Sequence, residues 1–478
     1  MSNLSELLPA GAGAKSASFV ASGTLGSGVT VALKSDGTVE AVSGTPEALS
    51  SEVAFESGST NMTTVCYDKN TNKIFVAYVD TGNSEYGTMC VGTVSGSSIS
   101  FGTPVVFFSN GTQYPAACYW EDQNKVFLAY ASKATPFNFA GFSHMISISG
   151  TVPTANYSYT FANNGVYHTS VSYASSQQRV LVSWMDASNS SYGVARVAYI
   201  VTGIQIGYGS QTTFNSTTTQ EIFSAYDPNT TFSAVVYKGT SSQGRGRSLL
   251  ITAGSNSFSV QAEATFNAAS TYNPRIAYDP DNQNFIIAYK DAGNSNKGTA
   301  CIATVSGAGA LSFSAEQVFA DYACDWPALS YDTINNQMIL SYQNNAISNR
   351  LEVRTISSDG STLSFGDPLN VGANISYTSS AFDPDTGKTV VTYRGTNGKS
   401  VVYSPLVTNY TDFIGITDQA IADTATGAVI VQGGVSEKVT GLTANTDYYV
   451  QVNGTLSTTV STVPAGRALS STSILLEG

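Results

Sequence analysis

Three segments of the sequence share an Asp-x-x-Asn-Ser pattern that suits either a cation or a turn. They begin at Asp80, Asp186 and Asp291. Clustered oxygen side chains are the ligands that Ca²⁺ prefers. Asp and Asn side chains also bond to nearby backbone N–H groups and so cap turns. Turn capping is the commoner use, so we expect no metal site, and calcium binding at these loops stays an open alternative.

The residue sets of enzymes are harder to find in this chain. Its two histidines, His144 and His168, match no metal-ligand or catalytic-triad spacing. No Gly-x-Ser-x-Gly segment marks a nucleophilic serine. The segment Gly244-Arg-Gly-Arg lacks the Lys-Ser/Thr that follows a phosphate-binding loop. We therefore expect no catalytic residues and no cofactor.

Aromatic and arginine side chains offer a different chemistry, which is recognition without reaction. Aromatic rings supply rigid contact area and arginine donates several hydrogen bonds, so both suit the binding of sugars or proteins. Such residues occur in the polar segments between apolar runs. The candidate ligand-binding residues are Tyr86, Phe137, Phe139, Tyr192, Arg245 and Arg247.

A sequence repeat supplies the elements that must position these residues. An aromatic residue recurs seven times, and a second aromatic residue follows each one eleven residues later. The first set is Tyr67, Tyr119, Tyr173, Tyr226, Tyr278, Tyr331 and Phe382, and the second set is Tyr78, Tyr130, Trp184, Tyr237, Tyr289, Tyr342 and Tyr393. A period of roughly 50 residues is typical of propellers, solenoids and other arrays.

Each repeat predicts a β-hairpin followed by two more strands. In the fifth repeat an apolar run ends at Tyr278, an Asp/Pro/Asn cluster follows, and a second apolar run ends at Tyr289. Turn residues between two short apolar runs indicate a hairpin. The constant spacing fits this, because a slip of one residue would turn the packed face outward. We predict an all-β fold with a seven-bladed β-propeller of four-stranded blades.

Two sets of loops would share one face of this ring: those between the second and third strands and those between blades. They differ most between repeats, and variable loops on a constant scaffold usually carry function. A sialidase-like carbohydrate-active propeller is the alternative, but it needs a convergent carboxylate pair and several arginines at inner strands. Arg275 is the one arginine that the sequence places beside an inner strand.

The seventh repeat lacks an outer strand, which predicts how the ring closes. The segment Gly44-Thr45-Pro46 is similar to Gly102-Thr103-Pro104 of a complete repeat. We therefore expect residues of about 37–56 to supply an N-terminal strand that closes the last blade. The predicted division is an N-terminal arm or docking segment (1–36), the propeller (37–412) and a small C-terminal β-domain (413–478).

Bulk properties exclude several classes of partner. The net charge is −12 and no Lys/Arg cluster occurs, which argues against nucleic-acid binding. Charged residues make up only 11% of the chain, compared with roughly 25% in soluble domains. The N-terminal sequence lacks the basic segment and apolar run of a signal peptide. No apolar stretch approaches the length of a membrane span. The five cysteines form no disulfide or zinc pattern.

The two ends of the chain carry short motifs outside the repeat. The first is Ser22-Gly-Thr-Leu-Gly-Ser-Gly-Val-Thr-Val-Ala-Leu-Lys-Ser-Asp-Gly-Thr-Val. The second is Phe413-Ile-Gly-Ile-Thr-Asp-Gln-Ala-Ile, with Gly441-Leu-Thr, Tyr448-Tyr-Val and Gly466-Arg-Ala-Leu-Ser further on. These segments resemble the leading segment of virion structural proteins from marine, cyanophage-type tailed bacteriophages and a small β-domain of phage tail-fibre and capsid-decoration proteins.

The resemblance implies a virion protein that is made in the host cytoplasm and leaves it by lysis. Its terminal regions would contact other virion proteins, and a homo-oligomer is compatible with this arrangement. The expected function is that of a tail fibre or adhesin that attaches to a host-surface glycan or protein through the variable loop face. A capsid decoration protein is the alternative within the virion. We expect neither nucleic-acid binding nor membrane insertion.

Overall fold

The computed structural model describes residues 15–133 and 138–477. Within these residues the chain forms β-strands joined by turns and by five single-turn 3₁₀ helices, η2 (Glu121–Gln123), η3 (Ser175–Gln177), η4 (Thr240–Ser242), η5 (Ala292–Asn294) and η6 (Tyr410–Asp412). None of these helices has the length and apolar character that crossing a membrane requires. The predicted all-β class is thus confirmed. The chain divides into a repeat domain (Leu49–Ser404) and a terminal domain (Met1–Ala48 with Pro405–Gly478).

The repeat domain is built from one antiparallel strand pattern. In a typical unit β25 (Ala264–Asp279) pairs with β26 (Asn284–Asp291), which pairs with β27 (Lys297–Val305), and β28 (Leu311–Phe313) follows at the outer edge. Tyr278 lies opposite Phe285 at the closed end of the hairpin. The predicted hairpin is therefore confirmed.

The other units repeat this order. Their first strands are β7 (Thr60–Asp68), β11 (Val105–Trp120), β16 (Val166–Ala174), β21 (Gln220–Tyr226), β29 (Gln317–Asp332) and β34 (Ser376–Asp383). The second strands are β8 (Lys73–Asp80), β12 (Lys125–Ser132), β17 (Arg179–Asp186), β22 (Phe232–Lys238), β30 (Gln337–Asn344) and β35 (Lys388–Arg394). The third strands are β9 (Tyr86–Ser95), β13 (Ala140–Ser149), β18 (Tyr192–Thr202), β23 (Gln243–Ile251), β31 (Arg350–Ser358) and β36 (Gly398–Ser404).

Short strands complete the outer edge of each sheet. They are β10 (Ser98–Phe101), β14 (Val152–Ala155), β15 (Tyr159–Ala162), β19 (Gln205–Tyr208), β20 (Thr212–Thr218), β24 (Phe258–Val260), β32 (Leu363–Phe365) and β33 (Leu369–Val371). The long strands β11, β25 and β29 each leave the edge of one sheet and become the first strand of the next.

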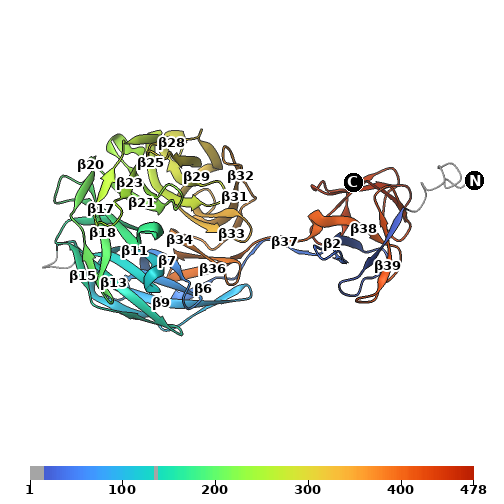
Figure 1. Ribbon diagram of the computed structural model, residues 1–478, viewed down its shortest axis with the longest axis horizontal. Helices are drawn as coiled ribbons and strands as arrows, with labels where there is room; N and C mark the ends of the chain where they lie inside the picture. Colours follow the sequence, from blue (N-terminus) through green and yellow to red (C-terminus); the bar gives the residue numbers. More distant parts are fainter. Residues whose placement is uncertain (1–14, 134–137, 478) are drawn as a thin grey trace, which may run out of the picture. The chain divides into compact units, whose positions relative to one another are not determined.

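The first strands surround a common centre, so the fold is propeller-like (Figure 1). Each first strand contacts the next one along the chain, and β34 contacts β7. Turn chemistry fixes the hairpins: the Asp279 carboxylate accepts N–H bonds from Asp281 and Asn282 within the turn. Asp68, Asp227, Asp332 and Asp383 cap the equivalent turns in the same way, as predicted.

The two aromatic sets have different structural roles. Every member of the second set lies in a second strand and is fully buried. The first set lies at the hairpin turns, where the Tyr331 hydroxyl donates to the Asp281 carboxylate and Tyr226 donates to Gln177 of the preceding unit. The first aromatics therefore connect adjacent units as well as packing within one.

The ring closes with a strand from the start of the chain. β5 (Ala48–Leu49) and β6 (Val53–Glu56) pair with β36 of the last unit. The Glu52 carboxylate accepts hydrogen bonds from the Tyr393 hydroxyl at 2.6 Å and from Lys399 Nζ at 2.8 Å. This confirms the predicted N-terminal closure, although only the C-terminal part of the expected segment takes part.

The terminal domain corrects the predicted boundaries 1–36, 37–412 and 413–478. One of its sheets has the order β1-β39-β38-β2-β3 and so mixes strands from both ends of the chain. Its members are β1 (Ser16–Val20), β2 (Thr30–Leu33), β3 (Val39–Ala41), β38 (Phe413–Thr417) and β39 (Thr426–Val431). The described N-terminal segment is therefore not a separate arm, because its apolar residues complete the core of the C-terminal strands.

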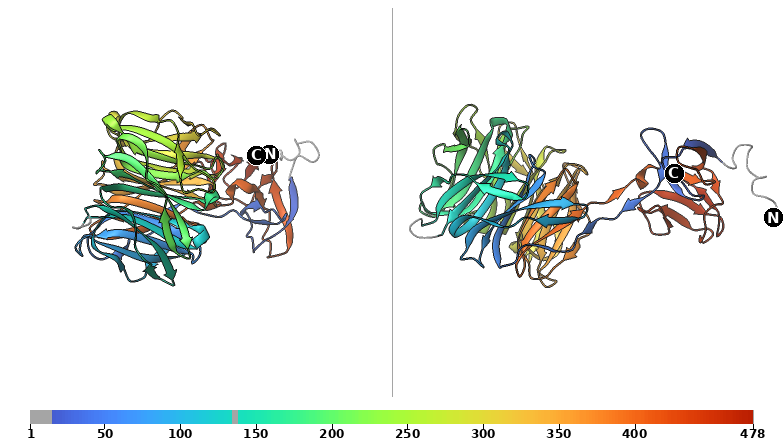
Figure 2. Two further views of the ribbon diagram at one scale, coloured as in Figure 1. Left: turned by 60° about the vertical axis from the view of Figure 1, so that its left-hand side comes forward. Right: turned by 90° about the horizontal axis from the view of Figure 1, so that it is seen from below.

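A second sheet and a short ribbon complete the terminal domain. The sheet has the order β40-β44-β43-β41-β42. Its strands are β40 (Val435–Ser436), β41 (Asp447–Val450), β42 (Leu456–Ser457), β43 (Pro464–Ala468) and β44 (Ile474–Leu476). The ribbon consists of β4 (Gly44–Thr45) and β37 (Val407–Thr408), where the two passages of the chain run side by side (Figure 2).

Candidate functional site

Every first strand of the repeat domain contains a β-bulge at the same position. The pairing with the second strand shifts register there, for example between Tyr272 and Arg275. One residue in each bulge has a positive φ of 47–52°, a left-handed conformation that costs about 1–2 kcal/mol for residues with a Cβ. The seven residues, hereafter the bulge ring, are Met62, Tyr114, His168, Glu221, Asn273, Trp326 and Tyr377.

The bulge ring lines a central cavity of about 420 Å³. Cavities of this size are typical of small-molecule sites, which occupy about 300–1,000 Å³. Bulges often change the direction of side chains next to functional sites. Glycine would relieve the backbone strain at these positions, but it would place no side chain there. The bulge ring thus presents seven side chains of six residue types on one repeated backbone conformation.

Aromatic rings occupy two parts of the bulge ring. Trp326 and Tyr377 contact each other with ring centroids 4.1 Å apart. Tyr114 lies 4.9 Å from the imidazole of His168. Neighbouring first strands thus bring together aromatic pairs that offer broad apolar surfaces to a ligand.

Charged side chains form a network around Glu221 and Asn273 of the bulge ring. The Glu221 carboxylate accepts the Asn273 N–H at 2.5 Å and forms an ion pair with Lys238 at 3.5 Å. The Asn273 amide in turn donates to Asp325 at 2.5 Å, and Lys290 pairs with Asp325 at 2.8 Å. Each carboxylate of this network therefore has its own lysine.

Arg275 follows the bulge and lines the same cavity. Its guanidinium lies 3.5 Å from the ring centroid of Phe223, and Nη1 donates to the Pro274 carbonyl at 3.1 Å. Burial lowers the pKa of Arg275 to about 9, an effect that Glu221 and Asp325 partly oppose. The side chain stays positively charged at neutral pH.

His168 is held neutral beside these cations. Burial lowers the pKa of His168 to about 4, and the positive charges of Lys238 and Arg275 lower it further in the same direction. An uncharged imidazole adds to the aromatic part of the cavity rather than to its charge.

The candidate residues from the sequence do not form a single site. Tyr86 and Tyr192 begin β9 and β18 and are half-buried, and Tyr192 packs against the core of its sheet. Phe139 stacks on Tyr167 at 4.5 Å, next to His168 of the bulge ring. Phe137 lies outside the described residues.

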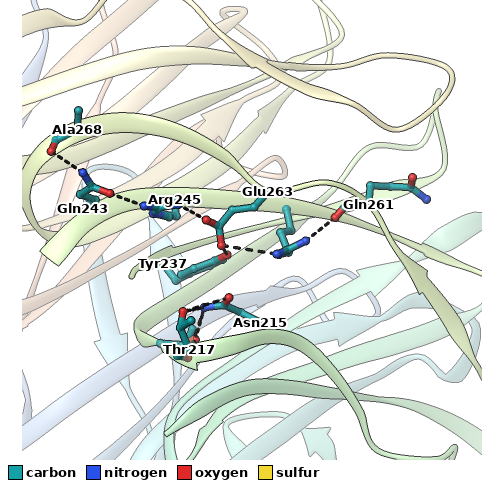
Figure 3. A network of polar contacts seen from close by, with 10 residues as sticks. Asn215, Thr217, Tyr237, Gln243, Arg245, Gln261, Glu263 and Ala268 are labelled. Atoms are coloured by element: carbon teal, nitrogen blue, oxygen red, sulfur yellow. Dashed lines mark hydrogen bonds and ion pairs between the residues drawn. The ribbon is translucent and has the colours of Figure 1, made fainter. Parts of the chain in front are cut away.

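Arg245 and Arg247 lie in β23 rather than in the expected loop, and both are engaged within their own unit. Figure 3 shows Arg245 beside Gln243 and Glu263. Arg245 pairs with the Glu263 carboxylate, and Arg247 Nη2 lies 3.7 Å from its other oxygen. The buried Tyr237 hydroxyl donates to the same carboxylate at 2.8 Å. Both arginines thus share one carboxylate and are held within their own unit by side-chain and backbone contacts.

The Asp-x-x-Asn-Ser loops are capped turns. The Asp291 carboxylate accepts the N–H groups of Gly293 and Asn294 at 2.9 and 3.2 Å, and Asp186 accepts the Ser188 N–H at 3.0 Å. The turn-capping prediction is confirmed for these two loops. Throughout residues 15–133 and 138–477, no cluster of three or more His, Cys, Asp or Glu side chains has metal-binding geometry.

The bulge ring was missed because its seven positions hold six different residue types. Its members nevertheless stand five residues before each first aromatic, from Met62 before Tyr67 to Tyr377 before Phe382. A position that varies within an otherwise constant strand was the available signal.

No family model matches the chain, and no curated protein matches it. Among solved structures, the BP39L lectin from Burkholderia pseudomallei is similar with a TM-score of 0.52 and 10% identity, covering 74% of this chain and 99% of the lectin. At this identity the likeness concerns the fold alone, and it supports a propeller-like β fold.

Two further solved structures have lower TM-scores. A protein of unknown function from Dyadobacter fermentans DSM 18053 has a TM-score of 0.44 and 11% identity, covering 74% of this chain and 96% of that chain. The Hadza microbial sialidase Hz136 has a TM-score of 0.43 and 8% identity, covering 77% of this chain and 69% of that chain.

Proposed function

We propose that the protein is a recognition module whose repeat domain is a seven-bladed propeller with its ligand site in the central cavity. The closed circle of contacts between the seven first strands supports the blade count. The bulge ring carries the functional part of the proposal, because seven strained positions place side chains of six residue types around one cavity of about 420 Å³. Strain of this kind collects at ligand sites.

Binding without reaction is the better supported use of this cavity. Glycoside hydrolysis uses two carboxyl groups on either side of the scissile bond. Among the described residues that line the cavity, Glu221 is the carboxylate and Arg275 the guanidinium. Glu221 is already held by Lys238 and the Asn273 N–H. A sialidase-like enzyme therefore remains the less supported alternative.

We place this module in a phage virion, where it attaches the particle to a glycan or protein of the host surface. The support is the resemblance of both chain ends to phage structural proteins, together with the pairing of these ends: β2 pairs with β38. One docking domain that contains both termini suits attachment to other virion proteins. Glycan is the preferred ligand because the similar solved protein is named a lectin. A capsid decoration protein is the alternative within the virion.

A glycan array probed with the intact chain tests the recognition proposal. We expect binding that Trp326→Ala and Tyr377→Ala weaken at least tenfold, because both remove aromatic surface from the cavity. Tyr157→Ala is the matched control, since the Tyr157 side chain is 79% exposed and does not line the cavity. Equal loss in all three variants, or none in any, would contradict a cavity site.

The virion and enzyme proposals need separate measurements. Mass spectrometry of purified parent particles should detect the chain, and absence from every particle would overturn the virion assignment. Incubation with host envelope polysaccharide should release no reducing sugar. Sustained release that Glu221→Gln abolishes would favour the enzyme.

A further inference from the structure

We propose that the central cavity selects a carboxylated sugar residue, with Arg275 as the group that binds the carboxylate. This inference rests on the proposed glycan-binding function and specifies the ligand class. It follows from the charges around the cavity, from the contacts of the guanidinium and from the uncompensated hydroxyl groups on the cavity wall.

The charges around Arg275 do not cancel. Glu221 pairs with Lys238 at 3.5 Å and Asp325 pairs with Lys290 at 2.8 Å. In the described part of the chain no carboxylate lies within 4.0 Å of the Arg275 guanidinium. The positive charge of Arg275 therefore has no ion-pair partner among these residues. His168 is neutral at physiological pH because its pKa lies at about 4. The group of five charged side chains thus carries one net positive charge, and Arg275 and Glu221 are its members that line the cavity.

The two lysines are fixed by more than their ion pairs. Lys238 Nζ lies 4.1 Å from the ring centroid of Tyr272, and Lys290 Nζ lies 5.8 Å from the same ring. Cation–π contacts of this length are favourable. Both carboxylates are therefore held by lysines with two contacts each, and neither carboxylate is free to move to Arg275.

The guanidinium of Arg275 is oriented but not saturated. It stacks on Phe223 at 3.5 Å, and its bond to the Pro274 carbonyl is the one hydrogen bond it makes within residues 15–133 and 138–477. A guanidinium has five N–H donors in a planar fork. Most of these donors remain for a ligand, and the stacking holds the plane of the fork in place.

Burial makes an anion at this position favourable. A buried unpaired charge is expensive, and an opposite charge within hydrogen-bond distance offsets that cost. The lowered pKa of Arg275 reports the same cost. An arriving carboxylate would compensate the residual charge one for one, whereas a phosphate dianion would exceed it. The planar fork also matches the two oxygens of a carboxylate.

The rest of the cavity suits a sugar ring. Trp326 and Tyr377 form the aromatic surface on the neighbouring first strands. Thr169 and Ser380 also line the cavity, and their hydroxyl groups are buried without a hydrogen-bond partner in the described structure. Buried hydroxyl groups are normally satisfied. Sugar hydroxyls carry both the donors and the acceptors that would satisfy these two.

Calorimetric titration of the intact chain tests this inference. The probes are galacturonate, glucuronate and N-acetylneuraminate, each compared with its methyl ester, together with galactose and inorganic phosphate. We expect at least one free acid to bind about ten- to hundred-fold more tightly than its ester, which is the effect of losing a charge-assisted hydrogen bond. Phosphate should bind more weakly than that acid.

Two variants assign the effect to Arg275. Arg275→Gln should reduce binding of the acid to the level of the ester, while Arg275→Lys should retain part of the difference because it keeps the charge without the fork. Arg350→Gln is the control, since Arg350 is exposed and bonds to Asn370. If Arg275→Gln does not fold, as judged by circular dichroism, the comparison of acid and ester on the unaltered chain decides the question.

The outcomes separate this inference from the proposed function. Equal binding of acids, esters and galactose would overturn the preference for carboxylates and leave glycan recognition intact. Tighter binding of phosphate than of any acid would also overturn it. If glycans of every class fail to bind on the array and in the titration, the proposed function fails as well.

Discussion

His168 places a titratable ring among cations at the centre of the repeat domain. Its imidazole contacts Tyr114 at 4.9 Å, and the charges of Lys238 and Arg275 act on it together with burial. All three influences favour the neutral form. The consequence is a pH dependence of stability that belongs to one residue of the bulge ring.

We predict that His168 destabilises the fold as the pH falls from about 6.5 to about 4. The unfolded histidine has a pKa of about 6.5, while the folded one has a pKa of about 4. Between these values the unfolded state binds a proton that the folded state does not, so stability is lost on acidification, by about 2–3 kcal/mol at most. Urea unfolding at pH 7.5 and pH 4.5 measures this loss.

A matched pair of variants isolates the effect of His168. His168→Asn should show a smaller loss between the two pH values, and Asn tolerates the left-handed backbone at this position. Tyr114→Phe changes the neighbouring side chain and should keep the full loss. An unchanged pH dependence in His168→Asn would refute the assignment.

At the scale of strands, a glycine and a phenylalanine form a repeated packing pair. In β23 a Cβ on Gly244 would lie 2.3 Å from the Phe266 ring. The same arrangement recurs at the start of other third strands, as with Gly298 and Phe319. In the sixth unit Leu351 takes the place of the glycine, and Val371 of β33 lies opposite it. This unit therefore packs two aliphatic side chains where the others place a ring against a glycine.

We predict that Gly244→Ala is destabilising by about 1–3 kcal/mol, the usual cost of overpacking. Gly246→Ala is the control in the same strand, because its Cβ would lie 3.3 Å from the movable end of Leu311. It should change stability by less than about 1 kcal/mol. The double variant Gly244→Ala/Phe266→Leu should recover part of the loss in thermal unfolding. Equal effects of the two alanines would show that the ring contact is unimportant.

The sequence was informative about strands wherever local chemistry repeats. The spacing from Tyr278 to Tyr289 and the cap at Asp279 predict the hairpin because both act within one turn. The bulge at Asn273 was not predicted, because the equivalent positions of the seven repeats share a backbone conformation but not a residue type. Arg245 was misplaced because a Gly-Arg-Gly-Arg segment has loop-like composition, whereas its ion pair with Glu263 depends on folding.

For the whole molecule, pairing between distant ends of the chain decides the domain boundaries. Ser16 lies opposite Ile430 in the β1–β39 pair, and Thr30 lies opposite Ile416 in the β2–β38 pair. Local patterns predicted a small β-domain at 413–478 but carry no information on pairing over such separations. The repeat domain is therefore an insertion within the terminal domain rather than the middle of three consecutive domains.

This arrangement predicts that residues 413–478 do not fold alone. Val429 and Ile416 are fully buried, and both pack in clusters that contain N-terminal residues such as Val31 and Ala32. Removing β1, β2 and β3 would expose this surface and leave β38 and β39 as a two-stranded sheet with both edges open. The isolated fragment should show poorly dispersed amide resonances in NMR spectra and no cooperative thermal transition.

Joining residues 15–45 to residues 407–478 should restore the fold. Thr45 lies opposite Val407 in the β4–β37 pair, so a two-residue Asn-Gly turn can replace the whole repeat domain and close a hairpin. The fusion should give dispersed amide resonances and one cooperative transition, because every strand of the terminal sheets is then present. A folded 413–478 fragment, or an unfolded fusion, would argue for three consecutive domains. The expected pair of results would instead mean that the repeat domain can be exchanged without disturbing the terminal domain.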